Sequence, residues 1–286
     1  MFANAAQRAA TLRRLMREGT VALPGAINAL SARLIEHMGF SAMYLSGAVL
    51  ANSVHGLPDT GLVTLTEAEC HARSIARVTK IPLIMDADTG YGEPANAART
   101  VEVLEAAGVS GIHIEDQVFP KRCGHLEGKE LVPAGEFAEK IAAAAEAKHA
   151  RDFLLIARTD ARSVAGYDDA VRRARLYIEA GADAVFPEAL TTEQEFRRFA
   201  QDVGGNLLAN MTEFGKTRYF TVDQFQDMGY NLVIFPVTLQ RAAMYAMAAV
   251  LDEVREKGTQ RDYVDRMQSR QDLYDLLGYR REDKEA

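Results

Sequence analysis

Apolar residues follow two alternating patterns along the chain. Short runs of five to seven residues, rich in valine, isoleucine and leucine, are separated by longer segments in which apolar residues recur every three or four positions. Runs of the first kind are typical of buried strands, and segments of the second kind are typical of amphipathic helices. We therefore predict eight strands, which cover residues 21–26, 42–46, 83–88, 111–116, 154–160, 184–189, 207–213 and 232–237.

The segments between these strands have helical periodicity and clear stop signals. Ala97, Val101 and Leu104 form one apolar stripe, and glycine ends two of the helices before the next strand begins. Eight strand–helix units predict a single (β/α)8 barrel domain over residues 1–286, with extra helices at both termini and a C-terminal helical extension over about 260–286. A doubly wound open sheet is the alternative, but the sequence has no glycine-rich phosphate turn after the first strand.

The first eighteen residues hold four arginines and no acid before Glu18. This composition also fits a mitochondrial presequence. We favour an amphipathic first helix that buries Leu12, Leu15 and Met16, because almost no chain precedes the first strand.

Composition excludes several classes of protein. The net charge is −7 and no basic stripe is present, which argues against a nucleic-acid partner. The apolar runs are far too short to span a bilayer, and two cysteines do not make a disulfide framework. We therefore expect a protein without nucleic-acid or membrane partners that acts in the cytoplasm, or in the mitochondrial matrix if the source is eukaryotic.

Polar residues gather where the predicted strands end. Side chains two positions apart on a strand share a face. The C-terminal ends of the strands are where barrels of this kind form active sites, and buried charge is costly unless it is paired or bound. Five strands thus point to one active site, through the pairs Asp86 and Asp88, His113 and Glu115, Arg158 and Asp160, Phe186 and Glu188, and Asn210 and Thr212.

Four carboxylates suggest a metal site. Asp86 and Asp88, with Asp59 and Glu115 in support, are hard oxygen ligands that suit Mg²⁺ or Mn²⁺, partly through water. No lysine is expected beside Asp86 and Asp88. The alternative is that these acids pair with Arg158 and other bases, which is compatible with a metal site.

Cys123 lies in the basic segment KRCGH, residues 121–125, directly after an acidic strand end. Basic neighbours favour the thiolate form, and glycines at 124 and 128 would let such a loop close and reopen. A buried apolar cysteine is the alternative, and the charged neighbours disfavour it at this position. For Cys70, which lies in a helical pattern, we expect burial as a small apolar residue.

Motifs spread over nearly the whole chain resemble the isocitrate lyase and phosphoenolpyruvate mutase superfamily, and within it most closely the methylisocitrate lyases. The resemblance implies a (β/α)8 barrel, Mg²⁺ dependence and a homotetramer in which the last barrel helix is exchanged between subunits. The motifs are YLSGA, LPDTGLVT, DADTGYG, IHIEDQ, KRCGH, ARTDA, FPEA, NMTEFG, FPVTLQR and KGTQ.

The resemblance also implies an activity. The expected substrate is the tricarboxylate 2-methylisocitrate, cleaved to pyruvate and succinate by Mg²⁺-dependent retro-aldol chemistry in the methylcitrate cycle of propionate breakdown. By the same resemblance, Cys123 is the acid that protonates the succinate carbanion, and Arg158 and Glu188 orient the reacting alcohol and carboxylate. The base that takes the alcohol proton stays open among Tyr44, Glu115 and a water bound to the metal.

The remaining residues that the resemblance assigns bind the substrate. Ser46, Gly47 and Ala48 hold the keto-acid portion, partly through backbone groups. Ala48 stands where a second glycine is common, which matters little for a backbone contact. The residues assigned to the succinyl portion, to the carboxylates or to the loop of Cys123 are Asn210, Met211, Thr212, Arg241, Arg270, Gly124 and His125.

The extra methyl group of 2-methylisocitrate requires an apolar slot. Phe186 shares a strand face with Glu188, and Ile234 and Pro236 share a face on the eighth strand, so these three residues could form it. Isocitrate lyase is a rival interpretation, but it is a longer chain with tryptophan near the position of Phe186, and this chain has no tryptophan.

Two further interpretations remain. Phosphonopyruvate enzymes and oxaloacetate decarboxylases share the barrel and its acids but generally lack the KRCGH loop. A catalytically silent scaffold would be expected to have lost Cys123 or one of the acids, and all of them are present.

Overall fold

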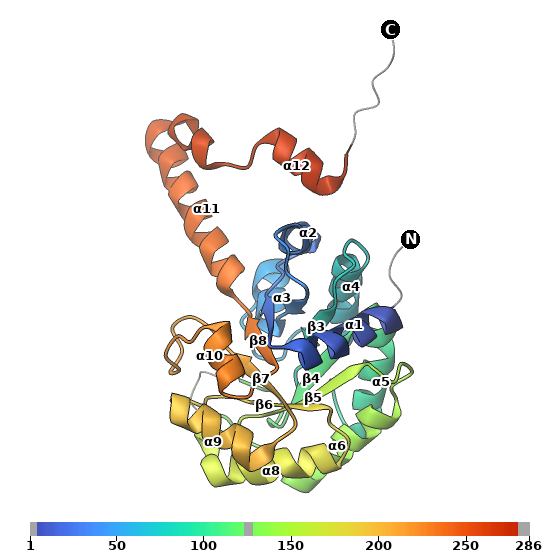
Figure 1. Cartoon of the computed structure of the whole chain (residues 1–286). Helices are drawn as coiled ribbons and strands as arrows, with labels where there is room; N and C mark the ends of the chain where they lie inside the picture. Colours follow the sequence, from blue (N-terminus) through green and yellow to red (C-terminus); the bar gives the residue numbers. More distant parts are fainter. Residues whose placement is uncertain (1–4, 123–127, 280–286) are drawn as a thin grey trace.

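The computed structural model describes residues 5–122 and 128–279. In these ranges eight parallel strands form a barrel surrounded by helices, which confirms the predicted (β/α)8 fold (Figure 1). The strands are β1 (Val21–Pro24), β2 (Met43–Leu45), β3 (Leu83–Asp86), β4 (Gly111–Glu115), β5 (Leu154–Thr159), β6 (Ala184–Pro187), β7 (Asn206–Asn210) and β8 (Leu232–Phe235). The helices are α1 (Ala5–Glu18), α2 (Ala29–His37), α3 (Gly47–His55), α4 (Leu65–Ala76), α5 (Pro94–Ala106), α6 (Ala134–Glu146), α7 (Ala161–Val164), α8 (Tyr167–Glu179), α9 (Glu193–Val203), α10 (Val222–Asp227), α11 (Thr238–Lys257), the 3₁₀ helix η1 (Arg261–Arg266) and α12 (Arg270–Leu277).

Each strand pairs with its neighbours around the barrel, in the order β1-β8-β7-β6-β5-β4-β3-β2. A single bridge between Gly25 and Tyr44 links β1 to β2 and completes the ring. Only glycine fits at position 25, because a Cβ atom there would lie 2.1 Å from the carbonyl oxygen of Pro236. All eight strands end earlier than predicted, because the residues at their predicted C-terminal ends lie in the connections that follow them.

Helix α1 closes the N-terminal end of the barrel. Leu12 and Met16 are buried in one cluster with the residues that begin several strands, among them Val21, Leu154 and Leu232. The prediction of an amphipathic first helix is therefore confirmed. Such a plug keeps water out of the barrel interior from below and leaves the opposite end as the open face.

Arg8 is also buried on α1, which the apolar pattern did not indicate. Its guanidinium donates hydrogen bonds to the carbonyl oxygens of Ala76 at 2.7 Å, Thr79 at 3.2 Å and Gly108 at 2.8 Å. These carbonyl groups lie at or just past the C-terminal ends of α4 and α5, where a positive charge is favourable. On α4 the expectation for Cys70 is wrong, because its side chain is exposed while Ala68 is the residue that faces the core.

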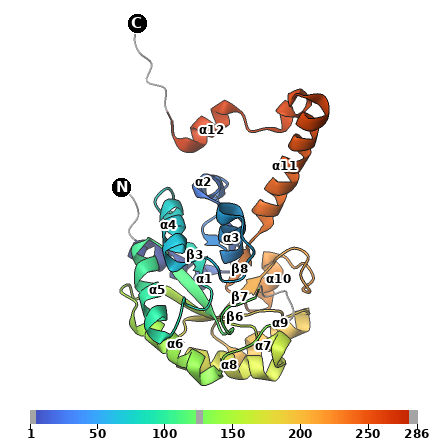
Figure 2. The same cartoon turned by 180° about the vertical axis from the view of Figure 1, so that it is seen from behind.

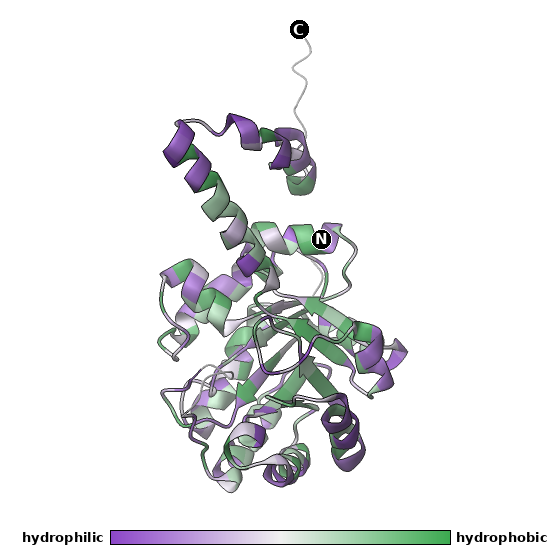
Figure 3. Ribbon diagram, turned by 90° about the vertical axis from the view of Figure 1, so that its left-hand side faces the viewer, coloured by the Kyte–Doolittle hydropathy of each residue, from purple (hydrophilic) through white to green (hydrophobic). Residues whose placement is uncertain are grey.

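The C-terminal part of the chain leaves the barrel. Helix α11 projects from the end of β8, and α12 then returns above α2 (Figures 1 and 2). Within the described part of the chain no residue of α11 is buried, although hydrophobic residues occur along its length (Figure 3). The described residues include no helix that is both long enough and apolar enough to cross a membrane.

Candidate active site

A pocket of about 950 Å³ opens at the C-terminal ends of the strands. Six strands and the start of α11 contribute side chains to it, so the structure brings together most of the residues singled out from the sequence. Those that line the pocket are Tyr44, Ser46, Ala48, Asp59, Asp86, Arg158, Phe186, Glu188, Asn210, Thr212, Ile234, Pro236 and Arg241.

Other candidate residues lie beside the pocket or away from it. The thioether of Met211 accepts a hydrogen bond from the backbone of Phe220 within an outer core cluster, so its side chain belongs to that cluster. Arg270 begins α12, which packs on α2, and is not among the residues that line the pocket of this chain. Cys123, Gly124 and His125 fall outside the described residues.

Residues 46–48 form the start of α3 at the edge of the pocket. Ser46 is the N-cap and Gly47 begins the helix, so the positive end of the helix dipole lies at the pocket, where a carboxylate is favoured. The N–H group of Gly47 lies 3.2 Å from Asp86 Oδ2 and donates a hydrogen bond to it. A Cβ atom at position 47 would lie 2.9 Å from the same oxygen, so glycine is required for this approach.

Lys121 enters the carboxylate cluster, which corrects the expectation that no lysine lies beside Asp86 and Asp88. Its ammonium group contacts Asp59 and lies 3.0 Å from Asp88 Oδ1. The side chain reaches the cluster from the connection between β4 and α6. The sequence did contain this residue, next to Cys123, but nothing local indicated that it would turn toward β3.

The charges in this cluster are strongly coupled. Burial raises the pKa of Asp88 to about 6, although Lys121 acts in the opposite direction. Burial alone would raise the pKa of Asp86 too, but the fields of His113, Lys121 and Arg158 outweigh it and lower the value. Burial would lower the pKa of Lys121, yet the surrounding carboxylates raise it well above its usual value, so the ammonium stays charged.

The donor chemistry of the cluster fits a hard divalent cation. Glu115 Oε1 is buried and has no hydrogen-bond partner among the described residues. Asp86 and Asp88 place further carboxylate oxygens nearby, at the end of the adjacent strand. No three histidine, cysteine, aspartate or glutamate side chains in the described ranges are arranged to ligate one ion directly. A magnesium ion would therefore keep several water ligands, as is usual for this ion.

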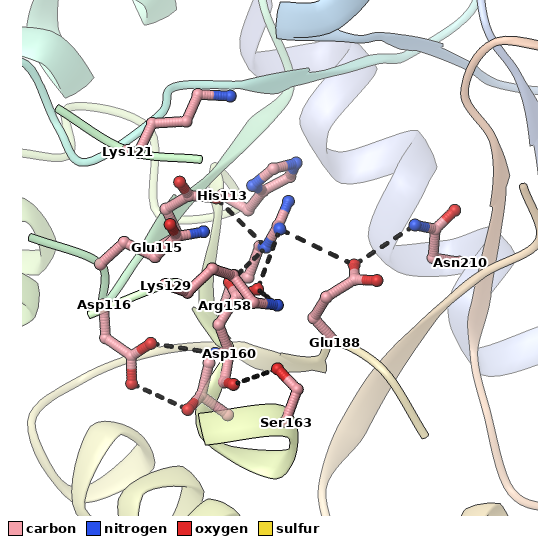
Figure 4. A network of polar contacts seen from close by, with 12 residues as sticks. His113, Glu115, Asp116, Lys121, Lys129, Arg158, Asp160, Ser163, Glu188 and Asn210 are labelled. Carbon is pink, nitrogen blue, oxygen red and sulfur yellow. Dashed lines mark hydrogen bonds and ion pairs between the residues drawn. The ribbon is translucent and has the colours of Figure 1, made fainter. Parts of the chain in front are cut away.

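Arg158 is the central cation of the pocket (Figure 4). Its Nε atom lies 3.2 Å from Glu115 Oε2 and 3.0 Å from Asp160 Oδ2, and its Nη2 atom lies 3.9 Å from Glu188 Oε2. Asn210 Nδ2 in turn donates to Glu188 Oε2 at 3.3 Å. Burial disfavours the charge of Arg158, but these carboxylates raise its pKa well above the usual value. The pocket thus keeps a permanent positive charge for an anionic ligand.

Tyr44 and His113 form a buried pair inside the barrel. The tyrosine hydroxyl lies 2.7 Å from His113 Nε2, and the two rings are stacked. Burial lowers the pKa of His113 to about 4, so the imidazole is neutral near pH 7. Burial and the charge of Asp86 raise the pKa of Tyr44 well above its usual value, which disfavours the tyrosinate that a base would require.

Backbone strain also concentrates around the pocket. Asp88, Ala189 and Phe214 are non-glycine residues with positive φ angles of 46°, 68° and 60°. Each lies at or just beyond the C-terminal end of a strand that contributes to the pocket. Such conformations cost free energy and persist where the surrounding structure holds them, commonly at functional sites.

Comparison with known proteins places this arrangement in a family. The family model described as phosphoenolpyruvate phosphomutase matches residues 12–255, and the chain belongs to this family. This confirms the resemblance that the sequence motifs indicated.

Individual relatives are similar over most of the chain. The 2-methylisocitrate lyase of Aeropyrum pernix is 55% identical over 259 residues, which cover 91% of this chain and 83% of that protein. The crystal structure of 2,3-dimethylmalate lyase is 37% identical, has a TM-score of 0.90, and covers 97% of this chain and 92% of its own. A phosphonopyruvate hydrolase in complex with oxalate and Mg²⁺ is 32% identical, has a TM-score of 0.85, and covers 95% of both chains.

The close approach of Gly47 to Asp86 generates a prediction. We expect Gly47→Ala to displace the Asp86 carboxylate and to lower kcat/KM by about 10-fold or more, since small misplacements in a site are costly. The fold should be retained, because the contact involves one side chain. Gly135→Ala on α6 is the matched control, since a Cβ atom there would meet nothing within 4 Å. Equal kinetic constants for the two variants would contradict the expectation.

Proposed function

We propose that the protein is a carbon–carbon lyase that cleaves 2-methylisocitrate to pyruvate and succinate. The observation that carries the proposal is a pocket that combines a buried arginine, several carboxylates around it and a wall of apolar side chains. Phe186, Ile234 and Pro236 line this wall, and Arg158 lies over the Phe186 ring at 5.1 Å from its centroid. The similarity to the 2-methylisocitrate lyase of Aeropyrum pernix, which is 55% identical, supports the same substrate.

The residues of the pocket suit the expected reaction. In the cleavage the alcohol loses its proton, the carbon–carbon bond breaks, and the electron pair passes to the succinate fragment. Arg158 faces the developing negative charge, and its fixed position avoids reorganisation during the reaction. Asn210 and Thr212 can donate hydrogen bonds to the succinyl carboxylates. By the family resemblance, Cys123 then donates a proton to the carbanion.

We further propose Mg²⁺ as the cofactor, with Mn²⁺ as a possible substitute. Asp86 and Asp88 would hold it, in part through water, and Asp59 and Glu115 would support them. When bound, the ion would polarise the oxygen atoms of the keto-acid portion. The N–H group of Gly47 at the start of α3 donates to Asp86, and Ser46 and Ala48 on either side of it line the pocket, so this segment would lie beside the keto-acid portion.

An assay with four substrates tests the function. We expect release of pyruvate and succinate from 2-methylisocitrate in the presence of Mg²⁺, and loss of activity with chelator. Isocitrate would yield glyoxylate, 2,3-dimethylmalate would yield propionate, and oxaloacetate would yield no succinate, so the co-product identifies the reaction. Asp88→Ala should weaken the response to Mg²⁺ with the fold retained. Faster turnover of any of the other three substrates would refute the proposed substrate, and activity insensitive to chelator and to Asp88→Ala would refute the metal site.

The apolar wall generates a prediction about specificity. Phe186 is 1% exposed and contacts His113 edge-on, so a larger ring at this position has to project into the pocket. We expect Phe186→Trp to lower kcat/KM for 2-methylisocitrate by roughly 10-fold or more relative to isocitrate, the range that one methyl group commands in an apolar pocket.

Phe186→Leu is the matched control, because it removes the ring without filling the slot. It should lower both values of kcat/KM by similar factors. Circular dichroism should show that both variants are folded, since overpacking a core also destabilises proteins. If Phe186→Trp affects both substrates equally, Phe186 does not contact the methyl group.

We also propose that the protein is a homotetramer in which α11 is exchanged between neighbouring subunits. Tyr245 is 83% exposed and Leu251 is 68% exposed on this helix, which is unusual for large apolar residues on an isolated surface. Light scattering should give four times the chain mass of 31.4 kDa. Leu251→Glu should shift the protein to smaller species, whereas Glu256→Gln at the end of the same helix should not. A monomeric mass for the wild-type protein would refute the proposal.

A further inference from the structure

A buried carboxylate behind the pocket holds Arg158 in place. Asp160 Oδ2 accepts a hydrogen bond from Arg158 Nε at 3.0 Å, and Oδ1 accepts one from Nη2 at 3.3 Å (Figure 4). Two parallel bonds between a guanidinium and a carboxylate fix both its position and its plane. Asp160 is 0% exposed, and it is not among the residues that line the pocket. It therefore contacts Arg158 from the protein side.

Asp160 is itself fixed by two neighbours. Lys129 Nζ lies 2.7 Å from its Oδ1 atom and donates a hydrogen bond to it. The backbone N–H group of Asp160 donates to Asp116 Oδ1 at 3.0 Å. These contacts hold both the side chain and the backbone of Asp160 at the point where β5 ends and α7 begins.

Asp116 anchors this arrangement to helix α8. It is 0% exposed, and its second oxygen, Oδ2, accepts hydrogen bonds from three side chains of β5 and α8. The donors are the hydroxyl of Thr159 at 2.8 Å, the hydroxyl of Tyr177 at 2.8 Å and the guanidinium of Arg173 at 3.2 Å. A carboxylate with this many donors cannot move without breaking several buried bonds.

Arg158 has other carboxylates that compete for it. Glu115 lies 3.2 Å from its Nε atom and Glu188 lies 3.9 Å from its Nη2 atom. Without Asp160 these two groups would draw the guanidinium toward the carboxylate cluster or toward Asn210. The bidentate contact with Asp160 therefore decides which way the guanidinium faces.

We propose that Asp160 is a positioning residue for the cleavage reaction, which orients the Arg158 guanidinium toward the substrate and is held by Asp116 and Lys129. The inference rests on the proposed lyase function. It adds a requirement beyond the residues that line the pocket. The carboxylate of Asp160, which does not contact the substrate, sets the orientation of Arg158, which stabilises the developing negative charge.

The first test replaces the carboxylate by an amide of the same shape. We expect Asp160→Asn to lower kcat by roughly 10- to 100-fold, as expected for a displaced catalytic group, while KM changes by less than about threefold. A purely structural role would instead lower the melting temperature and leave kcat per folded protein unchanged.

Asp183→Asn is the matched control. Asp183 also accepts from two basic residues, Arg13 at 2.8 Å and Lys148 at 2.9 Å, and from the backbone of Leu155 at 2.8 Å. It lies just before β6, at the closed end of the barrel. This variant should lose stability without loss of kcat.

Asp160→Asn leaves two buried cations with one carboxylate fewer and could prevent folding. The double variant Asp160→Asn with Lys129→Gln removes one charge of each sign and restores the balance. It should fold and still show the lowered kcat, because the guanidinium of Arg158 has lost the same anchor. Normal kcat in the folded double variant would overturn the proposal.

A double-mutant cycle tests whether Asp160 acts through Arg158. In an Arg158→Lys background, Asp160→Asn should lower kcat by less than about threefold further, because coupled residues are not additive. A full additional loss would show that Asp160 acts by another route and would overturn the proposal.

The same measurements separate this inference from the proposed function. All ratios are taken on the substrate that the wild-type protein turns over fastest. If that substrate is not 2-methylisocitrate, the proposed substrate is wrong, while an unchanged kcat for Asp160→Asn on it refutes the positioning role alone. If the wild-type protein cleaves none of the four substrates, the proposed function fails and the positioning role fails with it.

Discussion

The ion pair between Arg158 and Asp160 is the interaction on which the site depends. A guanidinium within a barrel of apolar side chains is unfavourable unless carboxylates surround it. The structure supplies three, Asp160, Glu115 and Glu188, but only Asp160 binds through two parallel hydrogen bonds. Glu115 and Glu188 approach the guanidinium at 3.2 Å and 3.9 Å. Asp160 thus balances the buried charge of Arg158, and in our proposal it also orients this cation toward an anionic ligand.

The second constraint is the crowding at the ends of β2 and β3. Gly47 lets the start of α3 approach Asp86, so helix N–H groups and the carboxylates of the proposed metal site lie within one small region. Lys121 adds a positive charge beside Asp59 and Asp88. Burial raises the pKa of Asp88, whereas at Asp86 the fields of His113, Lys121 and Arg158 outweigh burial and lower the pKa, so the two values move in opposite directions.

The barrel and its C-terminal helices differ in how far their apolar residues are buried. Within the barrel, apolar residues from strands and helices are almost all buried, and α1 closes one end. Helix α11 carries large apolar residues that the described part of the chain leaves exposed. Because Arg241 on its first turn lines the pocket, any subunit that packs against α11 would also influence the site.

The sequence by itself determined the eight strand–helix units and placed Asp86, Arg158, Glu188 and Asn210 at one end of the barrel. Both inferences depend on local features, namely the period of the apolar residues and the position of a polar residue relative to its strand end. Only the tertiary structure decided that Lys121 joins Asp88, that Asp116 anchors Asp160, and that Arg8 binds Gly108. These partners are 33, 44 and 100 residues apart, and a contact between such distant residues depends on how the whole chain packs, which no local pattern encodes.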